Sequence, residues 1–159
     1  METTITIKSI SEENLVDLFS TAFYGSTYLS ADYEESVEYN EDACYEEILA
    51  KVLLHGGKIY VTDHYAEGSA YGELPHAPSE DDEDNIVYQL TLEDILRGLE
   101  RAANGTFNAR EDIGGDFADN NIAFARRSFS DFAYDGDGCD AITADCLMQV
   151  ILFNEVVYG

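Results

Sequence analysis

Apolar residues recur at three- and four-residue intervals in four stretches of the chain, and this helical spacing constrains the fold more than any other pattern. Each stretch is bounded by residues that favour helix caps or breaks. The apolar positions expected to face a core are Leu15, Leu18, Phe19, Ala22, Phe23, Ile48, Leu49, Val52, Leu53, Leu92, Ile95, Leu96, Leu99, Leu147, Val150 and Ile151. The residues expected to begin or end these helices are Ser11, Gly25, Gly56-Gly57, Thr91 with Asp94 as a capping box, Asn104-Gly105, and Asp140 or Thr143.

Between the helices, alternating polar and apolar residues predict strands over 3–8, 58–63 and 86–90. Strands and helices interleave without a regular βαβ repeat. We therefore predict a single α+β domain over residues 1–159, in which a small, mostly antiparallel sheet packs with about four helices.

Two segments predict loops, which we interpret as insertions. Residues 64–84 contain both prolines and the acidic run Glu80–Asp84, and indicate a long hairpin loop. Residues 106–122 are rich in Gly, Asn and Asp and indicate a surface loop. Phenylalanines at 124, 129 and 132 then suggest a short helix of uncertain register, and Val156–Tyr158 a short strand or a docked tail.

The composition narrows the class of protein. The chain has 33 Asp and Glu against 8 Lys and Arg, a net charge of −25, yet 45% of its residues are apolar and 12% aromatic. A disordered acidic tail would carry fewer aromatic residues. Binding to a nucleic-acid backbone or an anionic membrane would need clustered Lys and Arg. We therefore expect a folded anionic domain whose partner is basic.

Targeting signals are not expected from this sequence. No apolar run approaches the roughly 18 residues of a membrane span, and the N-terminus is acidic where a signal peptide would be basic. We expect a protein of the host-cell cytoplasm.

Metal, cofactor and enzyme motifs are weak. Cys44, Cys139 and Cys146 form no CxxC pair and are expected to be reduced thiols. The sequence from Asp135 to Asp140 resembles the start of a calcium loop, but lacks its sixth-position Gly and twelfth-position Glu. The glycine pairs lie in no phosphate-binding frame, and no nucleophile motif is present. We expect no cofactor, no metal and no enzymatic activity.

The acids themselves are unevenly distributed. Eleven acids and no base lie between Lys8 and Lys51, and eight of the acids fall within 32–47. Like charges four residues apart in a helix, such as Asp42 and Glu46, destabilise it, so their repetition suggests that the charge is used. Carboxylates on neighbouring helical turns lie roughly 6 Å apart, a spacing comparable to that of phosphates along a strand.

These acids form our candidate partner-binding set, in which two tyrosines supply apolar anchors. The set is Asp32, Tyr33, Glu34, Glu35, Glu38, Tyr39, Glu41, Asp42, Glu46, Glu47, Glu80, Asp81, Asp82, Glu83 and Asp84. Two simpler interpretations stay open: a solvated face that only maintains solubility, and adaptation of a whole proteome to salt.

Two regions carry a family resemblance. The C-terminus combines an Asp140-Ala-x-Thr-x-Asp entry, a Leu147-x-Gln helix and a Phe153-x-Glu-Val-Val-Tyr-Gly ending, and residues 90–99 read Leu-Thr-x-Glu-x-Ile-x-x-Gly-Leu. With these motifs, and more loosely with its first helix, the chain resembles small acidic accessory proteins of phages and integrative elements. The 64–84 and 106–122 segments depart from that pattern. The resemblance implies a mobile-element origin and brings no catalytic residues.

Small acidic phage proteins include anti-restriction and anti-CRISPR inhibitors that mimic DNA, which supports the charge argument by analogy. The leading hypothesis is a non-enzymatic inhibitor whose acidic surface occupies the basic groove of a Cas protein or a restriction enzyme, without contacting nucleic acid or membrane. The alternatives are a regulatory or structural binding module that uses an apolar patch, and an enzyme with an unrecognised site. A homodimer is compatible with each.

Overall fold

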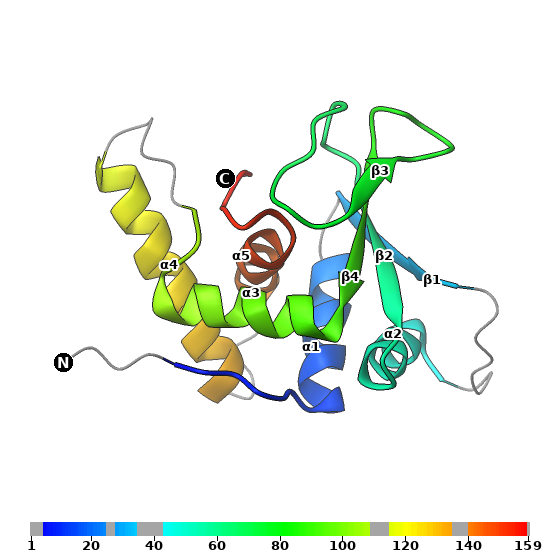
Figure 1. Cartoon of the computed structure of the whole chain (residues 1–159). Coiled ribbons are helices and arrows are strands. Elements are labelled where there is room, and N and C mark those ends of the chain that lie inside the picture. Colours follow the sequence, from blue (N-terminus) through cyan, green and yellow to red (C-terminus); the bar gives the residue numbers. More distant parts are fainter. Residues whose placement is uncertain (1–4, 25–27, 35–42, 109–114, 135–139, 159) are drawn as a thin grey trace.

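In the part of the chain that the structure describes, a four-stranded antiparallel sheet packs with five helices, which confirms the α+β prediction (Figure 1). The computed structural model describes residues 5–24, 28–34, 43–108, 115–134 and 140–158. The strands are β1 (Leu29–Tyr33), β2 (Lys58–Asp63), β3 (His76–Pro78) and β4 (Ile86–Thr91), in the order β1-β2-β4-β3. The helices are α1 (Glu12–Tyr24), α2 (Tyr45–Leu54), α3 (Leu92–Asn104), α4 (Gly115–Tyr134) and α5 (Ala141–Phe153).

Predicted helix caps are formed in three of the helices, α1, α3 and α5. Ser11 Oγ accepts a hydrogen bond from Asn14 N at 3.1 Å at the start of α1. Thr91 and Asp94 make the reciprocal bonds of a capping box, and α3 ends at Gly105 in the left-handed conformation. Of the two caps proposed for the last helix, Asp140 is the one used, because its side chain accepts from Thr143 N. That bond lowers the pKa of Asp140.

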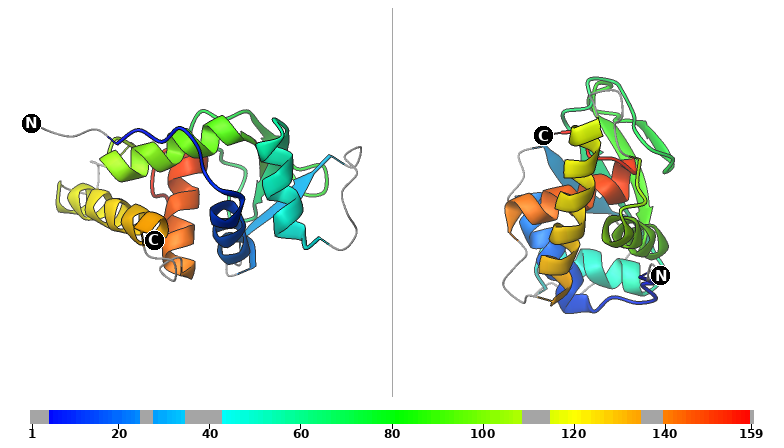
Figure 2. Two further views of the ribbon diagram at one scale, coloured as in Figure 1. Left: turned by 90° about the horizontal axis from the view of Figure 1, so that it is seen from below. Right: turned by 90° about the vertical axis from the view of Figure 1, so that its left-hand side faces the viewer.

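Helix α5 lies at the centre of the molecule and contacts α1, α3 and α4 (Figures 1 and 2). It is buried from Cys146 to Phe153, so it lacks the polar stripe of a surface helix. It crosses α3 closely at Gly98, where an added Cβ atom would lie 2.5 Å from Ile151 Cγ1. Glycine is required there for close packing of two helix backbones, not for its backbone freedom.

Several predictions are corrected by the structure. The segment 5–8, expected in a strand, lies extended along α3 (Figure 2, left), where Asn104 bonds both backbone groups of Ile5 and Glu100 accepts from Ile7 N at 2.5 Å. Side chains of α3 therefore satisfy its backbone in place of a neighbouring strand. The 64–84 loop contains β3, and the 106–122 loop is wrong from Gly115 onward, where the 20-residue α4 begins.

Strand β1 was not predicted, because Ser26–Asn40 shows no clear periodicity. It pairs with β2 in the register Leu29 opposite Asp63 and Tyr33 opposite Ile59. The C-terminal residues 156–158 form a docked tail and no strand.

Candidate partner-binding surface

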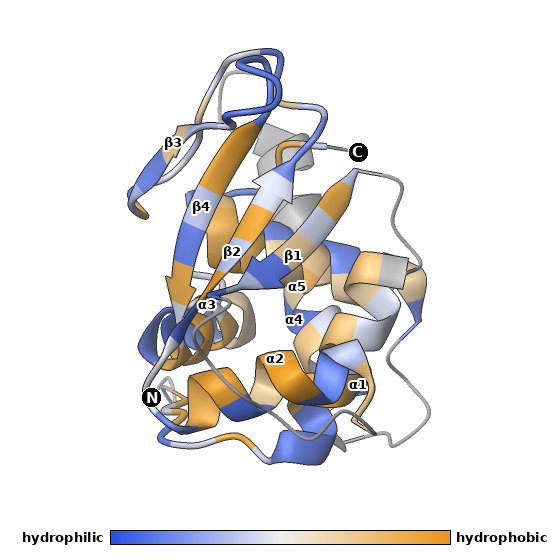
Figure 3. Ribbon diagram, turned by 90° about the vertical axis from the view of Figure 1, so that its right-hand side faces the viewer, coloured by the Kyte–Doolittle hydropathy of each residue, from blue (hydrophilic) through white to orange (hydrophobic). Residues whose placement is uncertain are grey.

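The sheet has one face packed on helices and one turned outward, and the outward face positions the candidate site. Along β2, Ile59, Val61 and Asp63 are buried, whereas Tyr60 and Thr62 between them are partly exposed. Figure 3 shows β1, β2 and β4 in front of α4 and α5, with more and less hydrophobic residues alternating along β1 and β2.

Ten of the predicted partner-binding residues are described by the structure. They fall into two groups, one around β1 and the start of α2 and one in the turn between β3 and β4. The other predicted residues, which are Glu35, Glu38, Tyr39, Glu41 and Asp42, lie outside the described residues.

The first group, which we call the β1–α2 patch, consists of Asp32, Glu34, Glu46 and Glu47. Asp32 is exposed on β1, and Glu34, which is also exposed, is the first residue after the strand. Glu46 and Glu47 lie in the first turn of α2, where negative charge interacts favourably with the helix dipole. The patch therefore gathers carboxylates from two successive elements, a strand and the helix that follows it.

Tyrosine hydroxyls hold two carboxylates of the β1–α2 patch. Tyr45 donates to Asp32 Oδ1 and to the carbonyl of Ala31, both at 2.9 Å. Tyr60 lies opposite Asp32 in the sheet and donates to Glu34 Oε1 at 2.9 Å, which raises the pKa of Tyr60. These bonds limit the orientations that the two carboxylates can adopt before any partner binds.

Tyr45 and Tyr60 were missed as site residues. Tyr60 alternates with Ile59 and Val61, a pattern that predicts an outward side chain. Its position opposite Asp32 depends on the pairing of β1 with β2, and the sequence around β1 shows no periodicity that predicts a strand. The predicted anchor Tyr33 contacts Tyr45, with ring centroids 5.6 Å apart.

The second group, which we call the turn patch, contains the five consecutive acids Glu80–Asp84 together with Glu67. All six are exposed. The turn is ordered by its own bonds: Asp82 Oδ1 accepts from Asp84 N at 3.0 Å, and Ser79 N donates to the carbonyl of Asn85. Gly68 N donates to the carbonyl of Asp84 at 2.8 Å and thereby brings Glu67, also missed from sequence, beside the run.

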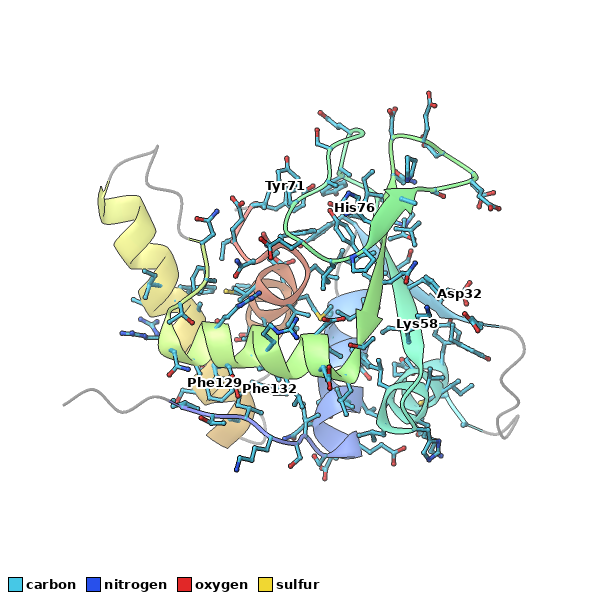
Figure 4. All side chains as sticks on the ribbon, in the orientation of Figure 1. Asp32, Lys58, Tyr71, His76, Phe129 and Phe132 are labelled. Atoms are coloured by element: carbon cyan, nitrogen blue, oxygen red, sulfur yellow. The ribbon has the colours of Figure 1, made fainter. Side chains whose placement is uncertain are left out.

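The two patches lie at opposite ends of the sheet. The turn patch adjoins the end where Ile86 pairs with Asp63, and the β1–α2 patch adjoins the end where Leu90 pairs with Ile59. Four residues of strand separate these levels, about 14 Å along β4. Figure 4 shows Asp32 and Lys58 toward one end of the sheet and His76 toward the other.

The basic residues are distributed differently from the acids. All five arginines lie in residues 97–127, which carry only five acids, whereas the other 128 residues carry 28 acids and three lysines. Two of these lysines lie near the β1–α2 patch: Lys51 in α2, and Lys58, which lines a hollow of about 350 Å³ with Glu34. Within the described chain the only ion pair joins Arg97 to Asp94 at 3.3 Å. The described carboxylates of both patches are therefore not neutralised by direct ion pairs.

A buried network of tyrosines and carboxylates lies behind the sheet and explains the C-terminal motif. Gln149 accepts from the backbone N–H groups of Val157 and Tyr158 at 2.8 and 2.7 Å, and donates to the carbonyl of Tyr158 and to Asp145. Tyr28 donates to the other oxygen of Asp145. The Asp, Gln and Tyr of the C-terminal pattern thus dock the tail onto α5.

This network perturbs its tyrosines. Burial, then the hydrogen bond to Asp145, raises the pKa of Tyr28, and burial with the bond to Asp63 raises that of Tyr158. Burial also raises the pKa of the Cys146 thiol to about 11, against a hydrogen bond with Ser128 that lowers it. Each of these groups stays protonated at neutral pH, so the network holds the tail in place and offers no ionised tyrosine for chemistry.

An exposed serine and histidine also interact at the outward face. Ser30 Oγ lies 2.8 Å from His64 Nε2, and Asn85 Nδ2 lies 3.1 Å from His64 Nδ1. With the amide nitrogen facing Nδ1, the ring accepts there and donates from Nε2 to Ser30, opposite to the polarity by which histidine activates a serine nucleophile. This arrangement orders the ends of β1, β2 and β4.

The described ranges contain neither a cluster of potential metal ligands nor a helix that could span a membrane. No three His, Cys, Asp or Glu side chains there are grouped closely enough to hold a metal ion. None of the described helices has the length and apolar character needed to cross a bilayer.

Comparison of the chain with family models, with curated proteins and with solved structures gives no match.

Proposed function

We propose that the protein is a non-enzymatic anti-defence inhibitor, which acts in the host cytoplasm by occupying the basic nucleic-acid-binding groove of a CRISPR effector or a restriction enzyme. The observation that carries this proposal is the placement of the β1–α2 patch and the turn patch at opposite ends of one sheet. The described arginines lie on α3 and α4, outside both patches.

The physical basis is the exchange of one polyanion for another. A groove that binds nucleic acid holds Lys and Arg against phosphates, and its affinity gains from the release of counterions. Carboxylates at the two ends of a sheet can contact different Lys and Arg side chains of the same groove. Asp32 and Glu34 are already oriented by tyrosine hydroxyls, which reduces the side-chain entropy lost on binding.

The partner can be identified by a pull-down from a phage-susceptible host lysate, performed at low and at high salt. We expect a nucleic-acid-binding effector to be retained, to be released as the salt concentration rises, and to be displaced by duplex DNA added as competitor. Retention that survives high salt and is insensitive to DNA would contradict a DNA-mimicking surface and favour a module that binds through apolar residues.

A further inference from the structure

Strand β3 forms one edge of the sheet and has a neighbouring strand on one side only. It pairs with β4, and Figure 3 shows it beside β4 on the side away from β2. All three residues of β3, His76–Pro78, are exposed. An edge strand of this kind presents backbone N–H and C=O groups along its free edge, and another chain can bind there as an added strand.

The hydrogen bonds between β3 and β4 show which backbone groups of β3 face the free edge. Just before the strand, the carbonyl of Pro75 accepts from Gln89 N of β4, and just after it Ser79 N donates to the residue that precedes β4, both at 2.9 Å. Bonded positions alternate with outward positions in an antiparallel ladder, so His76 and Pro78 turn their backbone groups away from β4. The free edge therefore presents the N–H and C=O of His76 and the C=O of Pro78, and none of these groups has a hydrogen-bond partner among the described residues.

The groups on this edge and the charge beside it select one kind of partner. The edge offers two acceptors and one donor, which the backbone of an extended peptide complements. The chain continues from Pro78 through Ser79 into the acidic run Glu80–Asp84, so an added strand that extends past Pro78 runs beside exposed carboxylates and is favoured if it carries Lys or Arg there. A second copy of this chain is disfavoured, because each copy has a net charge of −25 and Pro78 contributes no N–H to a ladder between copies.

We propose that β3 accepts, as an added strand, an extended segment of a partner protein that carries Lys or Arg next to the turn patch. The backbone of the segment bonds to His76 and Pro78, and its basic side chains contact Glu80–Asp84. This inference rests on the proposed function only in taking the partner to be basic. It adds a contact made by backbone groups to the contacts made by carboxylates.

The test uses NMR of the full-length protein at low salt, titrated to about 1 mM with a short synthetic peptide of alternating threonine and valine that carries lysines at one end. Two such peptides, with the lysines at the N-terminus or at the C-terminus, allow for either direction of the added strand. We expect saturable shifts of the His76 and Ala77 amides with at least one peptide, and slower hydrogen exchange of His76 N–H. Absence of saturation with both peptides would overturn the proposal.

Two control peptides separate strand addition from simple attraction between charges. The first is the binding peptide N-methylated at every threonine and valine, which keeps the lysines but has no N–H for the carbonyls of His76 and Pro78. The second carries glutamates in place of the lysines. Both should bind at least tenfold more weakly than the original peptide. Equal binding of either control would overturn the proposal, because the backbone bonds or the basic side chains would then contribute nothing.

Two substitutions at one position test the edge in the protein itself. His76→Pro removes the N–H of β3 that faces the free edge, and an edge strand tolerates proline at such a position because no bond to β4 is lost. His76→Ala is the matched control: both variants lose the ring and its 2.8 Å bond from Nδ1 to the carbonyl of Leu74, but alanine keeps the N–H.

The proline variant should bind the peptide about tenfold or more weakly than the alanine variant does. Equal affinities, with melting curves that show both variants to be folded, would overturn the proposal. Displacement of DNA from an effector by the carboxylates does not require strand addition, so this inference and the proposed function can fail separately.

Discussion

The hydroxyl of Tyr158 donates a 2.8 Å hydrogen bond to Oδ2 of Asp63, joining the C-terminal tail to the last residue of β2. Asp63 is fully buried, and its other oxygen accepts from Tyr65 N at 2.9 Å. A buried carboxylate is tolerated only when hydrogen bonds replace its water. The C-terminal tail therefore helps to stabilise the buried carboxylate at the end of β2.

We predict that Tyr158→Phe lowers the free energy of unfolding by about 1–3 kcal/mol, because Asp63 loses one of its two donors. Tyr60→Phe is the matched control, since it removes a hydroxyl bond to the exposed carboxylate of Glu34 and should cost less than about 1 kcal/mol. Urea unfolding of both variants provides the comparison. Equal losses would show that the buried bond has no special role.

Close packing of α3 on α5 gives a second prediction. In an exposed helix, Gly→Ala stabilises by about 1 kcal/mol. Here Gly98→Ala should instead destabilise by about 1–3 kcal/mol, because its methyl group would overlap Ile151. In an Ile151→Ala background, which lacks the Cγ1 atom, Gly98→Ala should cost less than in the unmodified protein, as a double-mutant cycle of unfolding free energies would show. A stabilising effect of the single substitution would mean that the helices do not cross this closely.

The raised pKa values predict loss of stability in alkali. In the unfolded chain the Cys146 thiol ionises near pH 9 and the tyrosines near pH 10, whereas in the fold the pKa of Cys146 is about 11 and those of Tyr28 and Tyr158 are raised. The stabilisation from these protonated groups is complete below about pH 9. It is lost as the pH rises from there through the folded pKa values.

Each of these groups contributes a slope of up to about 1.4 kcal/mol per pH unit between its unfolded and its folded pKa. Urea unfolding at pH 8, 10 and 11 measures this dependence. Tyr28→Phe should show a shallower decline than the unmodified protein. Parallel curves for the two proteins would mean that Tyr28 is not a source of the alkaline instability.

The spacing of apolar residues predicted those helices and strands whose apolar positions and caps match the way in which they are buried in the fold. Helix α3 combines a capping box, an apolar stripe and a C-terminal glycine, and its bounds followed from them. Strands β2 and β4 were predicted for the same reason. Strand β1 was missed because Leu29 is its only fully buried position, and its pairing depends on β2, about 30 residues away in the chain.

The candidate surface was predictable in its acids but not in its geometry. The runs at 32–47 and 80–84 are visible as charge, whereas the placement of the β1–α2 patch and the turn patch at opposite ends of one sheet depends on strand order. The same applies to the extended segment at Ile5 and Ile7, where alternation predicted a strand. Its hydrogen-bond partners are side chains of α3, about 95 residues away, which no local pattern reveals.

We predict that particular carboxylates, and not the overall charge, bind the partner. Two variants of equal charge separate these effects. The first neutralises the β1–α2 patch with Asp32→Asn, Glu34→Gln, Glu46→Gln and Glu47→Gln, keeping the acceptor oxygens for Tyr45 and Tyr60. The second makes four equivalent changes at exposed acids elsewhere, at Glu12, Glu13, Asp17 and Glu93.

The most direct measurement is displacement of fluorescent duplex DNA from purified CRISPR effectors and restriction enzymes by the unmodified protein and by each variant. We expect the unmodified protein to displace DNA from at least one effector. The patch variant should require about tenfold or more protein to do so, and the control variant should act as the unmodified protein does. Equal weakening of the two variants, or no displacement from any effector, would contradict this prediction.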